Sequence, residues 1–423
     1  MNENVPNGWA LYPLNTVLKE VKKKNKSNDN YPVFSVTKYN GFVRSNSYFK
    51  KQVFSRDLTT YKVVSEGQFA YATIHLDEGS LGLLEGVEKG LVSPMYTVFE
   101  TTGSIDNVFL FYLLKSDYFM RLYPSLGQGS IDRRASIPFK VLSGVEFLSP
   151  PLSEQKKIAA ILTSVDDVIN KTQAQIDKLK DLKTAMMQEL LTCGVGVDGK
   201  PHTEFKDSAV GKIPKGWACE RLESLLVVGK NSMRSGPFGS ALLKHELVPK
   251  GHPYLGIDNV HVERFEKKYK RFVSDEKFEQ LKRYKVNESD VMITIMGTVG
   301  RSCVVPKGIG KALSSKHVWT MSFDQKKYIP ELVCWQLNYS EWVKAQFKNE
   351  SQGGVMESIS SKTLKELWLP VPPISEQMKI REVHMSLSNL IREKEGALAK
   401  KVALKKALMQ DLLTGKVRVK VED

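Results

Sequence analysis

The sequence predicts an α+β protein in which two globular domains alternate with two long helices that pair as an antiparallel coiled coil, with pseudo-twofold symmetry. Three observations lead to this prediction: a length of 423 residues, an internal repeat, and two uninterrupted stretches with helical spacing of apolar residues. A chain of this length exceeds one ordinary core of roughly 100 to 150 residues, so at least two domains are expected. Hydrophobic residues make up 41% of the chain and charged residues 26%, a composition typical of folded proteins.

The repeat places two similar segments 222 residues apart. Pro150-Pro-Leu-Ser-Glu-Gln155 recurs as Pro372-Pro-Ile-Ser-Glu-Gln377, and Met187-Gln-Glu-Leu-Leu-Thr192 recurs as Met409-Gln-Asp-Leu-Leu-Thr414. No gap is needed across the 43 aligned positions, which indicates a true duplication. The order along the chain is therefore variable domain, similar segment, variable domain, similar segment.

Each similar segment predicts a long helix. Its apolar residues recur at steps of three, four or seven, the spacing of a coiled-coil seam. About 40 residues at 1.5 Å each give a helix of roughly 60 Å. Ser153 and Ser375 are expected to cap the N-termini, and Gly194 and Gly415 follow the last turns. The residues expected to pair the helices are Ile158, Leu162, Val165, Ile169, Ile176, Leu179, Met186 and Leu190 in the first copy, and Ile380, Leu387, Ile391, Leu398, Leu408 and Leu412 in the second.

A helix this long cannot bury its apolar stripe alone, so its duplicate is the expected partner. A twofold axis between the copies makes the helices antiparallel, and such a rod would hold the two domains apart. The alternative is two separate surface helices, each packed on its own domain.

The globular domains start with a weaker match, Pro6-Asn-Gly-Trp9 against Pro214-Lys-Gly-Trp217. Strand-like runs at residues 31–36, 69–74, 95–100, 291–295 and 318–322 mix with helical patches at 108–115 and 329–346, which predicts α+β domains. The expected boundaries are 1–149 for the first domain, 150–194 for the first helix, 195–210 for a linker, 211–370 for the second domain, 371–415 for the second helix and 416–423 for a tail.

The net charge of +15 predicts a polyanionic partner, either nucleic acid or an anionic membrane surface. No apolar stretch approaches the roughly 20 residues of a membrane-spanning helix, and the N-terminus is polar, so a cytoplasmic protein without a membrane partner is expected. The four cysteines are far apart and predict neither a zinc site nor a disulfide framework.

Basic residues gather in patches and alternate with aromatic ones. Such surfaces suit a nucleic acid, because cations meet phosphates while arginine forks and rings meet bases; a solvated lysine-rich face is the alternative. Glycine-containing loops at 127–130, 296–301 and 351–354 add glutamine and arginine side chains, although structural turns explain these glycines equally well. The candidate contact residues are Lys22, Lys23, Lys24, Arg44, Lys50, Lys51, Arg56, Gln128, Arg133 and Arg134 in the first domain, and Arg234, Arg264, Lys267, Lys268, Arg271, Arg283, Arg301, Lys316 and Gln352 in the second.

Motifs for catalysis are missing from the sequence. Residues 194–200 match the start of a phosphate-binding loop, but Pro201 stands where a magnesium-binding Ser or Thr is required, and no strand precedes it. Five of the seven histidines, those at 75, 245, 252, 261 and 317, are candidate ligands by residue type but lack metal-ligand spacing. The chain is expected to bind without reacting and to hold neither metal nor cofactor.

The full pattern resembles the specificity subunit of type I restriction-modification systems. The resemblance rests on the duplicated Pro-Pro-x-Ser-Glu-Gln helix start, the duplicated Met-Gln-x-Leu-Leu-Thr helix end, and Phe205-Lys-Asp-Ser-Ala-Val-Gly-Lys-Ile-Pro-Lys-Gly-Trp217 at the start of the second domain. It implies two target recognition domains, each reading one half of a split double-stranded DNA sequence, with the paired helices setting the unread gap.

The resemblance also implies partners. Two copies of an adenine methyltransferase subunit would dock on the helices and domains, and restriction or motor subunits would be added for cleavage. S-adenosylmethionine, ATP and magnesium would belong to those partners. Two other hypotheses stay open: a self-contained nuclease or methyltransferase, and a coiled-coil scaffold whose basic patches only solvate it.

Overall fold

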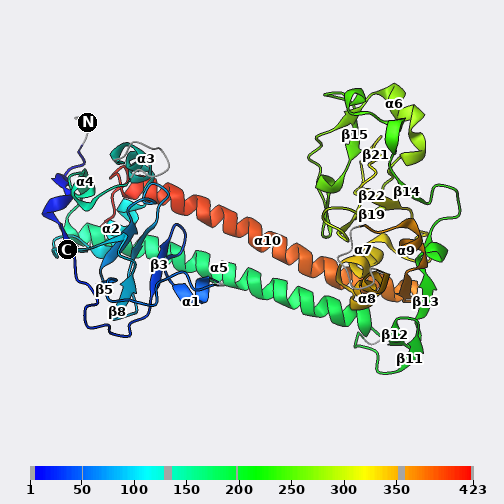
Figure 1. The fold of residues 1–423 in the computed structure, drawn as a ribbon, viewed down its shortest axis with the longest axis horizontal. Helices are drawn as coiled ribbons and strands as arrows, with labels where there is room; N and C mark the ends of the chain where they lie inside the picture. Colours follow the sequence, from blue (N-terminus) through cyan, green and yellow to red (C-terminus); the bar gives the residue numbers. More distant parts are fainter. Residues whose placement is uncertain (1–4, 50, 128–135, 197–198, 351–357, 421–423) are drawn as a thin grey trace. The chain divides into compact units, whose positions relative to one another are not determined.

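The computed structural model describes residues 5–49, 51–127, 136–196, 199–350 and 358–420. The chain divides into two compact units. The first unit comprises residues 1–174 and 395–423, and the second comprises residues 175–394. Each unit therefore contains one globular domain together with about half of each long helix (Figure 1).

The first unit is built around a four-stranded antiparallel sheet of order β2-β9-β6-β7. Phe69 and Phe99 stack across it with their ring centroids 4.9 Å apart. The strands are β1 (Ala10–Pro13), β2 (Leu18–Val21), β3 (Phe34–Thr37), β4 (Gly41–Arg44), β5 (Lys62–Ser65), β6 (Phe69–Ala72), β7 (Leu81–Leu83), β8 (Lys89–Val92), β9 (Tyr96–Thr101) and β10 (Glu146–Ser149), and the helices are η1 (Leu14–Thr16), α1 (Ser45–Tyr48), α2 (Asn107–Leu114), α3 (Asp117–Leu126) and α4 (Phe139–Ser143).

The second unit has an equivalent antiparallel sheet of order β14-β22-β19-β20. Its strands are β11 (Phe205–Ser208), β12 (Gly211–Pro214), β13 (Ala218–Arg221), β14 (Met233–Ser235), β15 (His252–Leu255), β16 (Val260–His261), β17 (Arg264–Phe265), β18 (Phe272–Val273), β19 (Val291–Thr294), β20 (Ser302–Val304), β21 (Leu313–Ser314), β22 (Val318–Met321) and β23 (Trp368–Val371). Its helices are η2 (Leu222–Leu225), η3 (Gly239–Ala241), η4 (Lys244–Glu246), η5 (Ile257–Asn259), η6 (Lys282–Tyr284), α6 (Asp275–Gln280), α7 (Pro330–Tyr339), α8 (Glu341–Glu350) and α9 (Ser361–Glu366).

The two domains share one plan, which confirms the predicted α+β class and duplication. In each domain an early strand pairs antiparallel with the strand that leads into the long helix, β1 with β10 in the first domain and β13, which follows the β11–β12 hairpin, with β23 in the second. In each, the third strand of the four-stranded sheet follows a residue with positive φ two positions earlier, Gly67 at 78° and Ser289 at 64°. In each, a helix then packs near that sheet, α2 against β7 and α7 against β20.

The helical patch predicted at residues 329–346 is two separate helices, α7 and α8, and not one continuous helix. Ser340 has extended backbone angles, φ −72° and ψ 129°, between α7 and α8. Its hydroxyl donates to Oε1 of Gln336, and the indole Nε1 of Trp342 donates to the same oxygen, each at 2.9 Å. The apolar spacing continues across this break, so periodicity alone could not reveal it.

The long helices are α5 (Leu152–Thr192) and α10 (Ile374–Leu412). Ser153 and Ser375 lie inside them, so the prediction that these serines are the N-caps is wrong. The carbonyls of Pro151 and Pro373 accept the first helical bonds instead, each 3.0 Å from the amide nitrogen four residues later. Gly194 and Gly415 follow the helices with φ of 65° and 71°, as a left-handed C-terminal turn requires.

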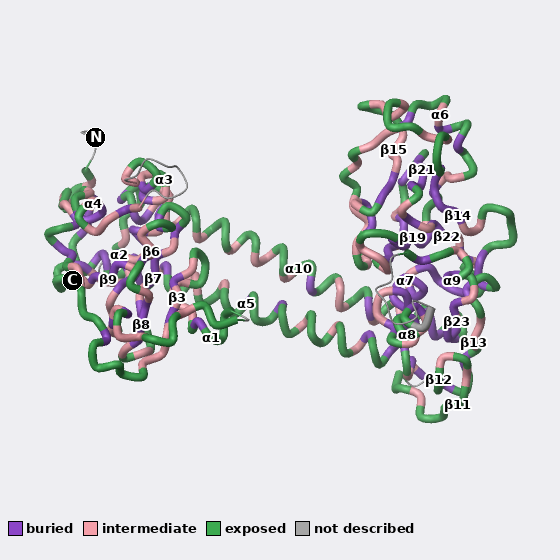
Figure 2. Tube along the Cα trace, viewed as in Figure 1, coloured by how far each residue is buried: buried purple, intermediate pink, exposed green. Residues whose placement is uncertain are grey.

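Within each unit the two helix halves pack antiparallel. In the first unit Asp166 binds Lys405 at 2.6 Å and Thr172 accepts from Lys401 at 2.9 Å. The numbers of the contacting residues therefore increase along α5 while they decrease along α10, as in an antiparallel pair. Figure 2 shows scattered buried residues along otherwise exposed helices. Of the predicted pairing residues, Ile158, Leu162, Ile176, Leu190, Ile380, Ile391 and Leu412 are buried, and Val165, Ile169, Leu179, Met186, Leu387, Leu398 and Leu408 are partly buried.

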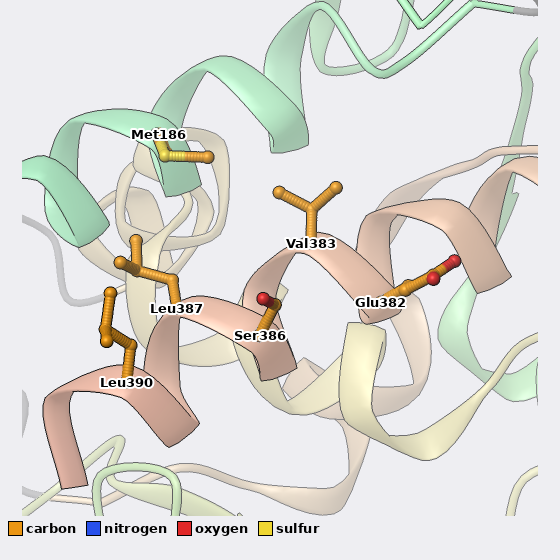
Figure 3. Close-up of a pocket in the computed structure, with 6 residues that line it drawn as sticks. All are labelled: Met186, Glu382, Val383, Ser386, Leu387 and Leu390. Atoms are coloured by element: carbon orange, nitrogen blue, oxygen red, sulfur yellow. The ribbon is translucent and has the colours of Figure 1, made fainter. Parts of the chain in front are cut away.

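In the second unit the helix pair leaves an open apolar groove. Met186 of α5 lies across from Val383 and Leu387 of α10, and their side chains point toward one another (Figure 3). The groove has a volume of about 430 Å³, and Glu382, Ser386 and Leu390 complete its lining. A surface hydrogen bond also joins the two helices, since Lys394 donates to Oε1 of the exposed Gln175 at 3.0 Å.

The repeated Ser-Glu-Gln sequence fastens each domain to the start of its helix. In the first unit the buried carboxylate of Glu154 accepts from the indole of Trp9 at 3.2 Å and from Arg418, which follows α10, at 2.8 Å. In the second unit Glu376 accepts from the indole of Trp217 at 2.9 Å, and from the Val195 amide at 2.8 Å. We call these two sets of contacts the glutamate latches.

The adjacent glutamines bond to the N-termini of α2 and α7. Gln155 Oε1 accepts from the amide of Asp106, the N-cap of α2, at 2.8 Å. Gln377 Oε1 accepts from the amide of Ile329, the N-cap of α7, at 2.9 Å. The sequence match between the two segments therefore reflects a conserved set of hydrogen bonds within each unit.

Candidate nucleic-acid interface

The first domain carries exposed basic side chains on the loops around its small sheets. Residues 22–24 follow β2, and the Lys23 carbonyl accepts from the Val63 amide at 2.8 Å, so this basic run is held beside β5. Lys22 also forms a surface ion pair with Glu20 at 3.1 Å. Arg44, Lys51 and Arg56 are exposed as well. The candidates Lys50, Gln128, Arg133 and Arg134 lie outside the described residues, as does Gln352 of the second domain.

The second domain presents a basic connection between β17 and β18. Lys267 and Lys268 are exposed there, whereas Arg264 pairs with Glu266 at 3.4 Å. Arg271 is partly buried and its guanidinium pairs with Asp258, so it is less available to a phosphate than the lysines are. Arg301 and Lys316 are exposed on separate loops.

Arg234 differs from the prediction of a DNA contact, because its guanidinium is buried and fully engaged with the protein. Nη2 pairs with the buried carboxylate of Asp290, Nε donates to the Lys285 carbonyl at 2.5 Å, and Nη1 donates to the Asn231 carbonyl at 2.9 Å and to Ser322 Oγ at 3.0 Å. Burial lowers the pKa of Arg234, while Asp290 opposes that shift. Arg234 is thus a structural residue. Its burial could not be predicted from the sequence, because Arg234 is a charged residue among polar neighbours.

An open hollow of about 320 Å³ lies directly over Arg234 on the surface of the second domain. Arg283 stands at this hollow, with its guanidinium 4.7 Å from the ring centroid of Tyr284. Three aromatic side chains in it were missed by the sequence interpretation, and Phe238 offered the clearest signal, since it is an aromatic residue inside the polar, glycine-rich loop 235–240. The hollow is lined by Asn231, Met233, Arg234, Ser235, Gly236, Phe238, Arg283, Tyr284 and Trp319.

Glu263 fastens the second domain to the helix halves of its own unit. This residue turns the β16–β17 hairpin with a positive φ of 58°, and its carboxylate binds Lys183 of α5 at 2.5 Å and His384 of α10 at 3.1 Å. His384 in turn lies against the Trp335 ring of α7, with centroids 3.9 Å apart. The bonds join residues 80 and 121 positions apart, so no local sequence pattern could predict them.

The Glu263 contacts predict a specific pH dependence. Burial would raise the pKa of Glu263, but the hydrogen bonds and charges of His384 and Lys183 outweigh burial and lower it to about 2. A carboxyl group with a lowered pKa stabilises the fold above its unfolded-state pKa, near 4.5, and this contribution is lost as the pH falls toward 2. We expect Glu263→Gln to cost up to about 3 kcal/mol at pH 7, and progressively less below pH 4.5.

Urea unfolding of both proteins at pH 7, 5 and 4 measures this difference. A matched control is Glu266→Gln, because the Glu266 side chain makes a surface pair with Arg264 and an exposed hydrogen bond with the Lys268 amide. A cost of Glu263→Gln that is the same at every pH would show that the charge of Glu263 does not contribute.

Among the described residues, no group of three or more His, Cys, Asp or Glu side chains is placed to hold a metal ion. Within the same part of the chain, no helix is long and apolar enough to cross a membrane.

Comparisons with known proteins agree with this architecture. The family model for the type I restriction modification DNA specificity domain matches residues 11–181 and 238–401. A putative type I restriction enzyme MjaX specificity subunit from Methanocaldococcus jannaschii is 26% identical over 439 residues, spanning 98% of this chain and 95% of the relative. The EcoKI specificity subunit of Escherichia coli K12 is 22% identical over 411 residues, spanning 89% and 81% of the two chains.

Solved structures show the same fold. A chain from a study of complex assembly and conformational transition in a type I restriction-modification system aligns with a TM-score of 0.61 at 15% identity, over 98% of this chain and all of that one. The S subunit of the type I system of M. genitalium aligns with a TM-score of 0.55 at 14% identity, over 97% of each chain. Since the family model covers most of both repeats, the chain belongs to the family of type I restriction-modification DNA specificity proteins.

Proposed function

We propose that this chain is the non-catalytic specificity subunit of a type I restriction-modification complex, and that each globular domain binds one half of a bipartite double-stranded DNA target. The observation that carries the proposal is the duplication of one domain plan, with exposed lysines and arginines on both copies. Residues 22–24 in the first domain and residues 267–268 in the second are exposed basic runs outside the helices. Their contacts would be to phosphates, which fix position, while other side chains read bases.

The helices would set the gap between the two half-sites, because α5 and α10 each contribute to both units. They would also dock the partners. Val168 and Leu182 of α5 are exposed by 44% and 48%, and their repeat equivalents, Leu390 and Leu404 of α10, by 41% and 55%. Apolar side chains kept on the surface at the same positions of both repeats support two copies of one partner, the adenine methyltransferase subunit.

S-adenosylmethionine would belong to that methyltransferase, and ATP and magnesium to the restriction and motor subunits that join the complex. The chain itself would recognise the DNA sequence and would contribute no catalytic group. Its place of action, on this proposal, is the cytoplasm.

Exchange of one domain tests the proposal. Residues 1–149 are replaced by the corresponding domain of a relative, the complex with the methyltransferase is expressed in cells, and methylated adenines are mapped by single-molecule sequencing. We expect one half-site to change while the other half-site stays the same, because each domain would read its own half.

The reciprocal control replaces residues 211–370, and it should change only the other half-site. Methylation that loses all sequence preference in the unmodified complex would contradict the proposal. Charge reversal at residues 22–24 and 267–268 that leaves DNA affinity intact would instead favour a scaffold whose basic patches only solvate it.

A further inference from the structure

The hollow of the second domain is held open by its own buried framework. Arg234 lines it and bonds to the Asn231 carbonyl of its own loop, to Lys285 and Asp290 on a second segment, and to Ser322 on a third. A Cβ atom at Gly236 would clash with the Ser314 carbonyl, so only glycine lets β14 run this close to the end of β21. The indole of Trp319 is fixed by its bond to the Ile359 carbonyl at 3.1 Å. The walls are therefore preorganised, which lowers the cost of binding a ligand there.

Arg283 is presented at this hollow as an oriented, uncompensated cation. Its guanidinium lies over Tyr284, and Nη2 donates to the tyrosine hydroxyl at 2.5 Å, which fixes the plane of the fork. No carboxylate pairs with Arg283 in the described part of the chain, whereas its neighbour Lys282 pairs with Glu279 at 3.0 Å. An exposed arginine that is stacked but carries no counter-charge is suited to an external acceptor.

Phe238 also lines the hollow. This residue is 62% exposed although its side chain is large and apolar, and it lies on the loop between β14 and η3. Exposed aromatic rings beside cations are typical of surfaces that contact bases. An arginine fork has its best match in the O6 and N7 acceptors of guanine in the major groove.

We propose that Arg283 reads a guanine in the half-site bound by the second domain, and that Phe238 packs on the base pair beside it. Tyr284 and Arg234 are positioning residues, the first for the plane of Arg283 and the second for the walls of the hollow. This inference rests on the proposed function, since it assigns base-reading residues within one of the two proposed recognition domains.

The experiment uses the complete methyltransferase complex with wild-type chain, Arg283→Ala, Arg283→Lys and Phe238→Ala. Methylation is mapped genome-wide, and affinity is measured on duplexes in which each base pair of the mapped target is changed in turn. The control is Lys282→Ala, an exposed cation next in sequence whose charge is already paired.

We expect the wild-type second half-site to contain a guanine at which discrimination falls by roughly 10- to 100-fold in both Arg283 variants, with the first half-site unchanged. Lysine should not rescue, because it lacks the planar fork. Phe238→Ala should weaken binding to the intact target by about 5- to 50-fold and relax preference at the adjacent pair. Lys282→Ala should keep the wild-type target.

Equal loss of affinity on every duplex would show that Arg283 contacts only phosphate, and an unchanged pattern would show that the hollow does not meet DNA. Either result overturns this inference while leaving a sequence-specific complex, and hence the proposed function, in place. Failure of the proposed function is seen separately, as absence of sequence preference in the wild-type complex.

Discussion

Replacing Arg234 by alanine is expected to lower the free energy of unfolding of the second unit by about 3–5 kcal/mol, because it leaves a buried carboxylate without its counter-charge. Asp290 is 2% exposed, and burial raises its pKa even with the guanidinium beside it. Without Arg234 that pKa should rise further. A group whose pKa is raised by folding destabilises the fold as the pH rises through it, so the loss should be larger at pH 7 than at pH 5.

Tryptophan fluorescence during urea unfolding is a suitable readout, since five of the six tryptophans, all except Trp9, lie in the second unit. Arg264→Ala is the control, an exposed arginine whose loss should stay within about 0.5 kcal/mol. The double variant Arg234→Met with Asp290→Asn should recover part of the loss, because removing both charges leaves none unpaired. A single-variant loss below about 1 kcal/mol would contradict the assignment of Arg234 as a structural residue.

Breaking the two glutamate latches should have unequal effects. Glu376→Ala removes the partner of the Trp217 indole, the Val195 amide and the His202 ring, and each buried donor left unpaired costs about 1–3 kcal/mol. We expect a loss of about 3 kcal/mol or more in the second unit. Glu154→Ala should cost less, about 1–3 kcal/mol, since Arg418 is 41% exposed and regains water when its partner is lost.

Hydrogen exchange measured by mass spectrometry separates these effects, because the exchange rate of a peptide reports local unfolding of the unit to which it belongs. Glu376→Ala should accelerate exchange in β13, β23 and α7, and Glu154→Ala in β1, β10 and α2. Glu376→Gln keeps a carbonyl acceptor and serves as the matched variant, with a smaller expected change. A larger effect of Glu154→Ala than of Glu376→Ala would show that burial of the donors does not control the cost.

The repeat and the long helices could be predicted from sequence because both are local or periodic signals. Apolar residues at a spacing near 3.5 require no knowledge of distant contacts, and the match between the two copies holds its register over the whole helix. The same local reasoning misassigned Ser153 and Ser375. Their identity suits a cap, but the helices begin at Leu152 and Ile374, two residues before the start that a serine cap would give.

The contacts that shape the second domain could not be predicted in this way. Arg234 is buried by partners 51, 56 and 88 positions away, and nothing in its neighbourhood separates it from an exposed arginine such as Arg283. Glu263 likewise meets its partners only in the folded chain. Charge patterns in a sequence identify surfaces with a basic excess, whereas the decision between a surface cation and a buried one is made by long-range packing.

The division of the chain has a consequence for the order of folding during synthesis. The second unit is continuous in sequence, residues 175–394, whereas the core of the first unit includes Leu412 and Leu413, and its glutamate latch needs Arg418. A ribosome delivers those residues only after the whole second unit has emerged. The N-terminal domain is therefore expected to complete its folding after the second unit, although it is synthesised first. This order is the reverse of the usual N-to-C order of domain folding.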